Sequence, residues 1–176
     1  MSNAADVSLR AATAADVPAL ADLGRESFVT KFGSLYRQDD LDTFLEQAFS
    51  PAAIARELAD PDRLYRLAEA DGQLRGYCKL ALACGWPDHA RGRHAIELKQ
   101  LYTAPGLTGL GIGKRLLDWA LAEAEARGAD EMQLSVWSGN HDAQRFYARH
   151  GFAKVADIHF MVGKQRDEEF LFARML

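Results

Sequence analysis

The chain has 176 residues, 48% of them hydrophobic and 26% charged, with a formal net charge of −4. A chain of this length can bury a sizeable core, and we expect one domain over residues 6–176. The acidic balance provides no general basic field for nucleic acid. No apolar run approaches the roughly 20 residues that cross a bilayer. We therefore expect neither nucleic acid nor a membrane as a partner.

The N-terminus and the cysteines indicate the compartment. Residues 1–5 include Ser2-Asn3-Ala4, which resembles a cloning remnant, and no secretion signal is recognisable. The two cysteines are Cys78 and Cys84, and no Cys or His pair has the spacing of a zinc site. These features predict a cytoplasmic protein with reduced cysteines and no metal.

Helix and strand signals alternate along the first half of the chain. Thr13 can cap a helix that has Asp16 in its first turn, and Ser50-Pro51 is a cap followed by a proline. Asp71-Gly72 between two apolar runs indicates an antiparallel hairpin. The predicted elements are a strand over 7–10, helices over 14–31, 39–49 and 51–60, and strands over 64–69 and 74–83.

The second half contains a strand, helix, strand crossover. A strand over 95–103 leads through a glycine-rich turn into a helix over 111–127, which Gly128 can end. Because this crossover joins runs of antiparallel strands, the pattern predicts a mixed α/β (α+β) sheet flanked by helices. The remaining predicted elements are strands over 132–136, 152–162 and 169–175 and a helix over 142–150.

The turn over residues 108–114, with the sequence T-G-L-G-I-G-K, has the composition of an anion-binding loop. Glycines let the backbone approach a ligand closely, and the first N–H groups of the following helix lack partners within the helix. The positive end of the helix dipole also favours an anion. The alternative is a flexible connector, but three glycines at a helix start favour phosphate binding.

Two common phosphate-binding motifs do not fit this turn. A Walker A loop requires glycine where Thr108 stands, and Ser or Thr where Arg115 follows Lys114. The dinucleotide motif G-x-G-x-x-G, started at Gly109, requires glycine or alanine at the position of Lys114. The turn is therefore predicted to bind a phosphate group of another ligand, at the end of a strand where ligands of such sheets commonly bind.

Residues 96–155 resemble the GNAT superfamily of N-acetyltransferases. Residues 100–105 look like the central strand of that family and its exit, and residues 108–113 match its Q/R-x-x-G-x-G/A pyrophosphate loop at both glycines. Residues 140–152, N-H-D-A-Q-R-F-Y-A-R-H-G-F, are similar to the family's N-x-x-A-x-x-F-Y-x-x-x-G-F element. Two motifs at the right separation make the resemblance specific.

The resemblance implies a mixed, mostly antiparallel sheet of about seven strands, with splayed central strands and helices on both faces. It also implies acetyl-CoA as co-substrate. The family usually has Gln or Arg where this chain has Thr108, although a Thr hydroxyl can still donate to a phosphate oxygen. We therefore expect backbone N–H groups to provide most of the binding. The implied pyrophosphate-binding residues are Thr108, Gly109, Leu110, Gly111, Ile112, Gly113 and Lys114.

Further features look like the branch of the family that acetylates diamines and polyamines such as spermidine. They are Val136-Trp137, residues 159–163, and Phe32-Gly33 followed by Tyr36 and Asp40-Leu41. They imply a small-molecule amine as the acceptor. The alternatives are a protein N-terminus or lysine, a small-molecule amine of another kind such as an antibiotic, and a coenzyme A binding module without catalysis. The patterns also allow a homodimer.

Acetyl transfer to an amine requires a neutral nucleophile. An alkyl ammonium with a pKa near 10.4 must lose its proton at pH 7, at a cost of about 4.6 kcal/mol, so a base or a water chain is needed. Glu97 resembles the position that supplies this base in some family members. Strand alternation would place it on the same face as Lys99 and Leu101. The alternative is a structural carboxylate paired with Lys79 or Lys99.

The resemblance also assigns the remaining groups. The backbone of Leu101, Tyr102 and Thr103 would pair with the pantetheine arm and supply an oxyanion donor, since the central strands of the family diverge there. Tyr147 would donate a proton to the departing coenzyme A sulfur, or else pack the short helix onto the sheet. Asn140 would bind the pantetheine, cap the helix that follows it, or do both in part.

The acceptor end of the site is the least defined part of the pattern. Carboxylates could attract a cationic amine there, although charged residues at helix starts are usually solvated. The basic run over 91–94 is expected to be either a solvated loop or an anion contact. The acceptor candidates are Glu26, Asp39, Asp40, Asp88, His159 and Trp86.

Overall fold

The computed structural model describes residues 6–176, so the expected cloning remnant at residues 1–5 lies outside the described residues. Strands and helices follow the predicted order. The strands are β1 (Ser8–Ala11), β2 (Arg63–Ala70), β3 (Gln73–Ala81), β4 (Ala95–Thr103), β5 (Glu131–Trp137), β6 (Ala153–Val162) and β7 (Gln165–Met175). The helices are η2 (Ala14–Asp16), α1 (Val17–Phe32), η3 (Gly33–Leu35), α2 (Gln38–Phe49), α3 (Pro51–Ala59), η4 (Pro87–His89), α4 (Ile112–Ala126) and α5 (His141–Arg149).

One seven-stranded sheet with the order β1-β2-β3-β4-β5-β7-β6 organises the molecule. Neighbouring strands are antiparallel except β4 and β5, which are parallel because α4 crosses over between them. Asp71 and Gly72 connect β2 to β3 with φ of 54° and 69°, the backbone of a tight two-residue hairpin. The predicted mixed, mostly antiparallel sheet is confirmed.

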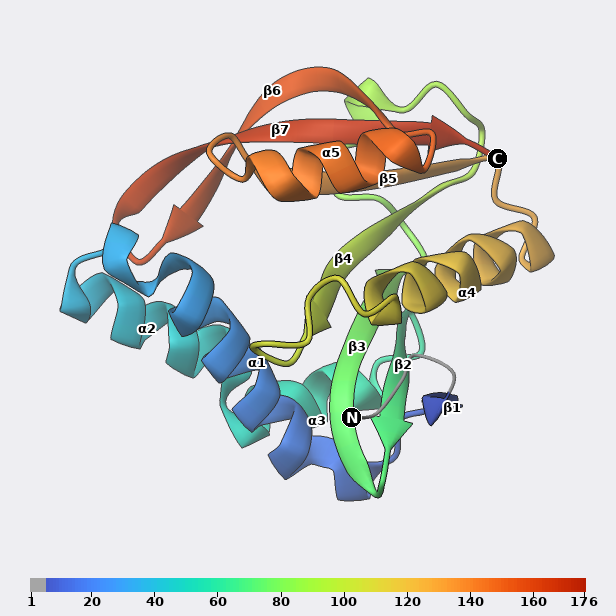
Figure 1. Cartoon of the computed structure of the whole chain (residues 1–176). Coiled ribbons are helices and arrows are strands. Elements are labelled where there is room, and N and C mark those ends of the chain that lie inside the picture. The colour runs from blue at the N-terminus through green and yellow to red at the C-terminus, as the bar shows by residue number, and fades with distance from the viewer. Residues whose placement is uncertain (1–5) are drawn as a thin grey trace.

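The central strands β4 and β5 pair only at their beginnings. Their pairing covers residues 95–97 of β4 and 131–133 of β5. Beyond these residues β4 pairs with β3, and β5 pairs with β7. Figure 1 shows the two strands diverging, with β1–β3 below and β5–β7 above. The facing edges of β4 and β5 therefore have backbone groups without a strand partner, and the predicted splay is confirmed.

Helices cover both faces of the sheet, and each face has its own hydrophobic core (Figure 1). We call them the α4–α5 face and the α1–α3 face. Leu116 and Ala120 of α4 pack with Ile96 and Leu98 of β4 on the α4–α5 face. The α1–α3 face is packed by Leu20, Leu45, Phe49, Ile54, Leu67 and Tyr77. The predicted helices on both faces are confirmed.

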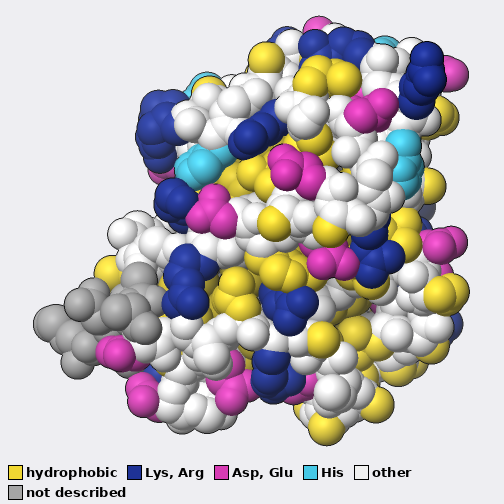
Figure 2. All heavy atoms as spheres, turned by 90° about the vertical axis from the view of Figure 1, so that its right-hand side faces the viewer, with side chains coloured by type: hydrophobic (Ala, Val, Ile, Leu, Met, Phe, Trp, Pro, Cys, Tyr) yellow, Lys and Arg dark blue, Asp and Glu magenta, His cyan; other side chains and the backbone are white. Residues whose placement is uncertain are grey.

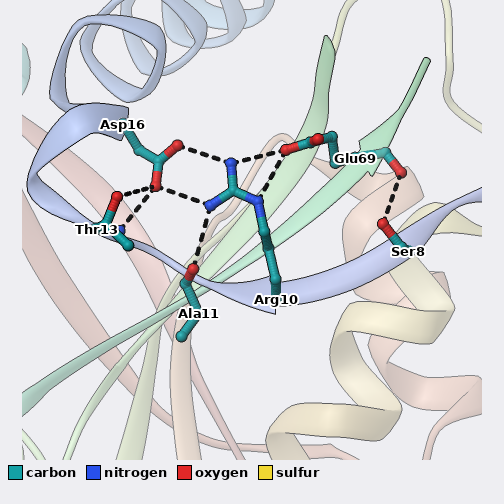
Figure 3. Close-up of polar contacts among 6 residues, drawn as sticks. All are labelled: Ser8, Arg10, Ala11, Thr13, Asp16 and Glu69. Carbon is teal, nitrogen blue, oxygen red and sulfur yellow. Dashed lines mark hydrogen bonds and ion pairs between the residues drawn. The ribbon is translucent and has the colours of Figure 1, made fainter. Parts of the chain in front are cut away.

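An ion-pair network around Arg10 fixes the entrance to α1 (Figure 3). Arg10 donates to the two oxygens of Asp16 at 2.8 and 2.9 Å and to Glu69 Oε2 at 2.9 Å. Asp16 also accepts from the N–H and the hydroxyl of Thr13. Hydrogen bonding from Arg10 lowers the pKa of Asp16 to about 2. Thr13 and Asp16 thus start the predicted helix, but its first turn is the 3-10 helix η2, and α1 begins at Val17.

A bulge in β4 changes which of its residues share a face. The register with β3 shifts so that Leu98 pairs with Leu80 and Gln100 pairs with Lys79, which leaves Lys99 as the extra residue. A bulge of this kind bends the strand and interrupts its two-residue alternation.

The bulge separates Glu97 from Leu101. Ile96 and Leu98 both pack on the α4–α5 face, so Glu97 between them points to the α1–α3 face. Leu101 packs on the α4–α5 face, and Tyr102 on the α1–α3 face. The prediction that Glu97 and Leu101 lie on one face is therefore wrong, because strict alternation does not hold across the bulge.

The last two strands pair along nearly their whole length. Gly163 and Lys164 form the turn, and β7 begins at Gln165, opposite Val162, rather than at residue 169 as predicted. The charged residues between 165 and 169 hid the start of the strand, because they resemble a loop in composition. In the structure these residues pair with β6 over 158–162.

The basic run over 91–94 forms a loop held by two of the chain's own carboxylates. The N–H groups of Arg91 and Gly92 donate to Glu131 Oε2 at 2.6 and 2.7 Å, and those at positions 93 and 94 donate to Asp130 at 2.9 Å. The side chains at 91, 93 and 94 are exposed. The run is therefore a solvated loop whose backbone is tied to the start of β5.

Figure 2 shows the side of the molecule that lies at the right of Figure 1. Charges of both signs are intermixed on this side. Helix α4, at the right of Figure 1, has two such pairs, Lys114 with Asp118 at 2.5 Å and Arg127 with Glu123 at 2.8 Å. Exposed pairs of this kind contribute little to stability. Within residues 6–176, no helix has the length and the apolar composition to span a membrane.

Candidate active site

A cleft of about 930 Å³ opens where β4 and β5 diverge. Its lining comes from five strands, from helices on both faces and from the loop that follows β4. The structure thus brings together residues from both sequence motifs. The predicted site residues that line the cleft are Glu97, Leu101, Tyr102, Thr103, Thr108, Asn140 and Tyr147.

The rest of the glycine turn lies next to this lining, at the N-terminus of α4. Gly109 and Gly111 have φ of 84° and 83°, a left-handed conformation that glycine adopts without strain. The first backbone bond of α4 runs from Arg115 N–H to Gly111 O at 3.1 Å. The N–H groups of residues 112–114 therefore have no acceptor within the helix and can meet an anion. Leu110 is exposed on the turn.

Lys114 is the only side chain of the turn with a fixed charge. Its ammonium lies 2.5 Å from Asp118 Oδ2, one helical turn further along α4, and both side chains are exposed. In this arrangement the ammonium points along the helix surface. The anion-binding capacity of the turn therefore comes mainly from backbone N–H groups.

Glu97 is a buried carboxylate with two contacts. Its side chain is 3% exposed, with Oε1 3.2 Å from Lys99 Nζ. Its Oε2 accepts from Gly85 N–H at 2.9 Å. The structural pairing expected with Lys99 is therefore present, whereas Lys79 binds Glu57 at 2.7 Å instead. Glu97 also lines the cleft, so the ion pair does not remove it from the site.

Tyr147 of α5 both packs in the core and lines the cleft. Its ring lies 5.2 Å from that of Phe146 and 5.7 Å from that of Phe152. Burial raises the pKa of the Tyr147 phenol, with a smaller contribution from Tyr102. The hydroxyl is therefore protonated at neutral pH and can donate a proton or a hydrogen bond into the cleft.

Asn140 caps α5 while it lines the cleft. Its Oδ1 accepts from Ala143 N–H at 3.2 Å, which is the capping bond that the sequence allowed. The turn before it is held by Gln144, whose amide donates to Trp137 O and Ser138 O. Because capping uses only the Asn140 oxygen, its NH₂ group can still bind a ligand.

Most of the predicted acceptor residues lie outside the cleft. Trp86 lines it, but Glu26, Asp39, Asp40, Asp88 and His159 do not. Asp40 Oδ1 accepts from Lys164 N–H at 2.7 Å and so ties α2 to the β6–β7 turn. His159 Nε2 lies 3.3 Å from Glu168 Oε1 on the neighbouring strand. Asp40 and His159 thus make contacts within the scaffold, and of the six acceptor candidates only Trp86 lines the cleft.

The cleft is also bordered by an aromatic wall, which the sequence indicated only through separate segments. Neighbouring rings of the wall pack against one another. The distances between ring centroids are 5.2 Å for Phe28–Phe32, 4.6 Å for Phe28–Phe44, 6.2 Å for Phe32–Trp137 and 5.8 Å for Phe44–Phe160. Phe32, Tyr36, Trp137 and Phe160 lie in the segments that resemble the polyamine branch, whereas the sequence analysis did not single out Phe44. The aromatic wall consists of Phe28, Phe32, Tyr36, Phe44, Trp137 and Phe160, all of which line the cleft.

Glu169 is a second missed residue of the cleft. Its Oε2 is shielded from solvent and has no hydrogen-bond partner among residues 6–176. Burial raises the pKa of the Glu169 carboxyl, and the nearby Asp167 adds to this effect. No sequence signal marks Glu169, because it follows a run of charged residues that resembles an exposed loop.

The fold and the cleft suit a transferase, because a glycine turn with free backbone N–H groups and a divergent pair of strands lie beside the aromatic wall in one cleft. The chain belongs to the acetyltransferase (GNAT) family, whose model matches residues 24–152. It is an N-acetyltransferase, and acetyl-CoA is its co-substrate. The predicted family, enzyme class and co-substrate are confirmed at this level.

Individual relatives cover nearly the whole chain. It is 27% identical over 165 residues, 92% of each chain, to an uncharacterized N-acetyltransferase in the pepI 3′ region of Lactobacillus delbrueckii subsp. lactis. It is 26% identical over 155 residues, 86% of this chain and 90% of the relative, to spermidine N(1)-acetyltransferase of Thermoplasma acidophilum.

The structure of PaiA N-acetyltransferase from T. acidophilum in complex with coenzyme A superposes with a TM-score of 0.80. The superposition covers 100% of both chains, at 23% sequence identity. This likeness confirms the predicted fold class. Within residues 6–176, no group of three His, Cys, Asp or Glu side chains could hold a metal ion.

Proposed function

We propose that this enzyme transfers the acetyl group of acetyl-CoA to a primary amine of a small organic cation, such as a polyamine. The observation that carries the proposal is that one cleft is lined by the β4 backbone at 101–103 and by the aromatic wall. The thioester of acetyl-CoA bound along β4 and an amine bound at the aromatic wall would therefore lie next to each other in the same cleft. Similarity to a spermidine N(1)-acetyltransferase supports the same acceptor class.

The donor side would hold acetyl-CoA mainly through backbone groups. The pantetheine arm would lie along the edge of β4 at Leu101, Tyr102 and Thr103, where no strand pairs on the β5 side. The pyrophosphate would bind the N–H groups of residues 108–114, with a hydrogen bond from the Thr108 hydroxyl. The Asn140 amide would donate to the pantetheine from the opposite side of the cleft.

The chemistry would proceed by direct attack, without a covalent enzyme intermediate. Glu97, directly or through water, would take one proton from the ammonium of the acceptor, and the neutral amine would attack the thioester carbon. A backbone N–H of β4 would stabilise the oxyanion. As the C–S bond breaks, Tyr147 would protonate the thiolate and then recover a proton from the new amide nitrogen. The proton on Glu97 would pass to solvent.

We also propose a cytoplasmic location. Cys78 is buried and Cys84 is partly buried, and both are free thiols. Burial raises the pKa of the Cys78 thiol to about 12, which keeps it protonated and unreactive. Fractionation of cells that produce the protein would check the location.

An assay of coenzyme A release against an amine panel tests the proposed function. The panel contains spermidine, spermine, putrescine, an aminoglycoside and peptides with free N-termini or lysines. We expect polyamines to give the highest kcat/KM. Faster turnover of peptides would favour a protein acetyltransferase, and binding of acetyl-CoA without any acetylation would favour a coenzyme A binding module. Absence of any heat or thermal shift with acetyl-CoA would contradict the proposal altogether.

A further inference from the structure

We propose that Glu169 binds a second ammonium group of the acceptor, at the far end of the aromatic wall from Glu97. The enzyme would thereby select amines that carry two positive charges separated by an alkyl chain. This inference rests on the proposed function, because it assigns a residue to the choice of acceptor rather than to acetyl transfer.

Glu169 lies on the face of the sheet from which the acceptor would enter. It is the cross-strand partner of Trp137. Leu134 and Val136 of β5 pack on the α4–α5 face, so Trp137 and its partner point to the α1–α3 face. Glu97 points to the same face from β4. Both carboxylates line the cleft, and the aromatic wall covers the same side.

The two carboxylates differ in their contacts. Glu97 has one oxygen on Gly85 N–H and the other close to Lys99 Nζ. Glu169 Oε2 is shielded from solvent and has no hydrogen-bond partner among the described residues. A shielded carboxylate oxygen without a partner is costly, unless a ligand supplies the missing donor. A primary ammonium has three donors and matches this requirement.

The strand register gives the spacing between the two carboxylates. Glu97 pairs with Gln133 at the start of the splay, and Glu169 pairs with Trp137. The two positions are therefore separated by four residues along β5, a rise of about 13 Å, and by two strand spacings across the sheet, about 10 Å. Both side chains line the cleft between these positions. This separation suits an alkyl chain with an ammonium at each end better than a single amine.

Lys99 is a cation that interacts electrostatically with both carboxylates. Its ammonium lies 3.2 Å from Glu97 Oε1. Burial raises the pKa of Glu169, whereas a hydrogen bond with Ser135 and, more weakly, the charge of Lys99 lower it. The other cations of the lining are Lys79, which is bound to Glu57, and Lys31 and Arg56, whose side chains are exposed. Ser135 hydrogen-bonds to the Glu169 carboxyl, but no cation of the described residues pairs with it directly, and its Oε2 has no hydrogen-bond partner among them.

The aromatic wall suits the connecting chain of such an acceptor. Phe28, Phe32, Phe44 and Phe160 offer apolar ring surface for methylene groups. The ring of Trp137, on the strand next to Glu169, can also attract an ammonium through its face. A zwitterionic or anionic amine would place a carboxylate or phosphonate near Glu169 and would be repelled. Two ammonium groups joined by methylenes therefore match the pocket.

Cadaverine and n-pentylamine test this inference, because they share a five-carbon chain and differ in one ammonium group. For the full-length enzyme with acetyl-CoA, we expect cadaverine to have a kcat/KM about tenfold or more above that of n-pentylamine, the range of one hydrogen bond to a charged group. Glu169→Gln should bring the two amines to within about twofold. The KM for acetyl-CoA should stay unchanged.

Glu168→Gln is the matched control, since Glu168 is 68% exposed, contacts His159 and lies outside the cleft lining. It removes the same charge and should keep the preference for cadaverine. Glu169→Asp keeps the charge and should retain a preference larger than that of Glu169→Gln. The melting temperature of each variant reports whether the fold is intact.

The outcomes separate this inference from the proposed function. The inference is wrong if the wild type has the same kcat/KM for both amines. It is also wrong if Glu169→Gln lowers kcat/KM for both amines by the same factor, because Glu169 then does not select a second ammonium. If the wild type acetylates no amine of any kind, the proposed function itself fails. A preference for cadaverine that is lost in Glu169→Gln and kept in Glu168→Gln supports the inference.

Discussion

The donor side and the acceptor side of the cleft are built in different ways. Apart from Asn140 and Tyr147, the side that we propose for the donor is one continuous stretch, from the end of β4 through the glycine turn into α4, and it offers mainly backbone groups. The acceptor side is a set of side chains from α1, α2, β4, β5, β6 and β7. Every residue except proline carries the same backbone donor, so the donor side depends on conformation, whereas the acceptor side depends on side-chain identity.

This difference explains how one scaffold can keep its co-substrate and change its acceptor. A backbone site tolerates side-chain changes as long as the φ and ψ angles are preserved. A side-chain site changes its preference with a single replacement. Substitutions on the two sides should therefore affect different kinetic constants, and four variants test this separation.

Tyr147→Phe is expected to have the largest effect. The loss of the hydroxyl should lower kcat by about a thousandfold, the range of general acid catalysis, while KM for acetyl-CoA changes little. Because burial raises the pKa of Tyr147 above its usual value near 10, the phenol should stay protonated through neutral and mildly alkaline pH. Steady-state kinetics over this pH range are the measurement. An unchanged kcat would assign Tyr147 to packing alone.

Glu97→Gln should lower kcat by about a hundredfold, since a water chain can partly replace the carboxylate. The buried ion pair with Lys99 complicates this variant, because its loss can also disturb the bulge in β4. Lys99→Gln breaks the same pair and keeps the carboxylate, so it serves as the control. An equal loss of kcat in both variants would show that the ion pair matters rather than proton transfer.

Gly109→Ala tests the backbone of the donor side. A Cβ at this position meets no atom within 4 Å, but φ is 84°, where a side chain costs about 1 kcal/mol. We expect the turn to shift and the Kd for acetyl-CoA to rise about tenfold. Gly128→Ala places similar strain at the other end of α4, with φ of 77° and no atom within 4 Å. It should lower the melting temperature and leave calorimetric binding of acetyl-CoA unchanged.

Thr108→Ala should have the smallest effect of the four. If backbone N–H groups bind the pyrophosphate, the loss of one hydroxyl should weaken acetyl-CoA binding by less than about tenfold, or about 1.4 kcal/mol. Titration calorimetry with acetyl-CoA measures this directly. A larger loss would mean that the donor side depends on a side chain after all, and the contrast between the two sides would weaken.

The sequence by itself determined most of the elements and the glycine turn before α4. Turn and cap signals placed the helices and strands to within a few residues, apart from the start of β7. The hairpin at Asp71 and the turn before α4 followed from local glycine and cap chemistry, which acts over a few residues and can be read directly. The motifs of residues 108–113 and 140–152 then indicated the family.

The tertiary structure alone decided the acceptor side. The bulge at Lys99 set Glu97 and Leu101 on opposite faces, against the alternation that a regular strand would impose. Phe28 and Phe160 line one pocket although 132 positions separate them in the sequence. Glu169 became a cleft residue only through the pairing of β7 with β5. Contacts between distant segments depend on register and packing, which no local pattern of the sequence encodes.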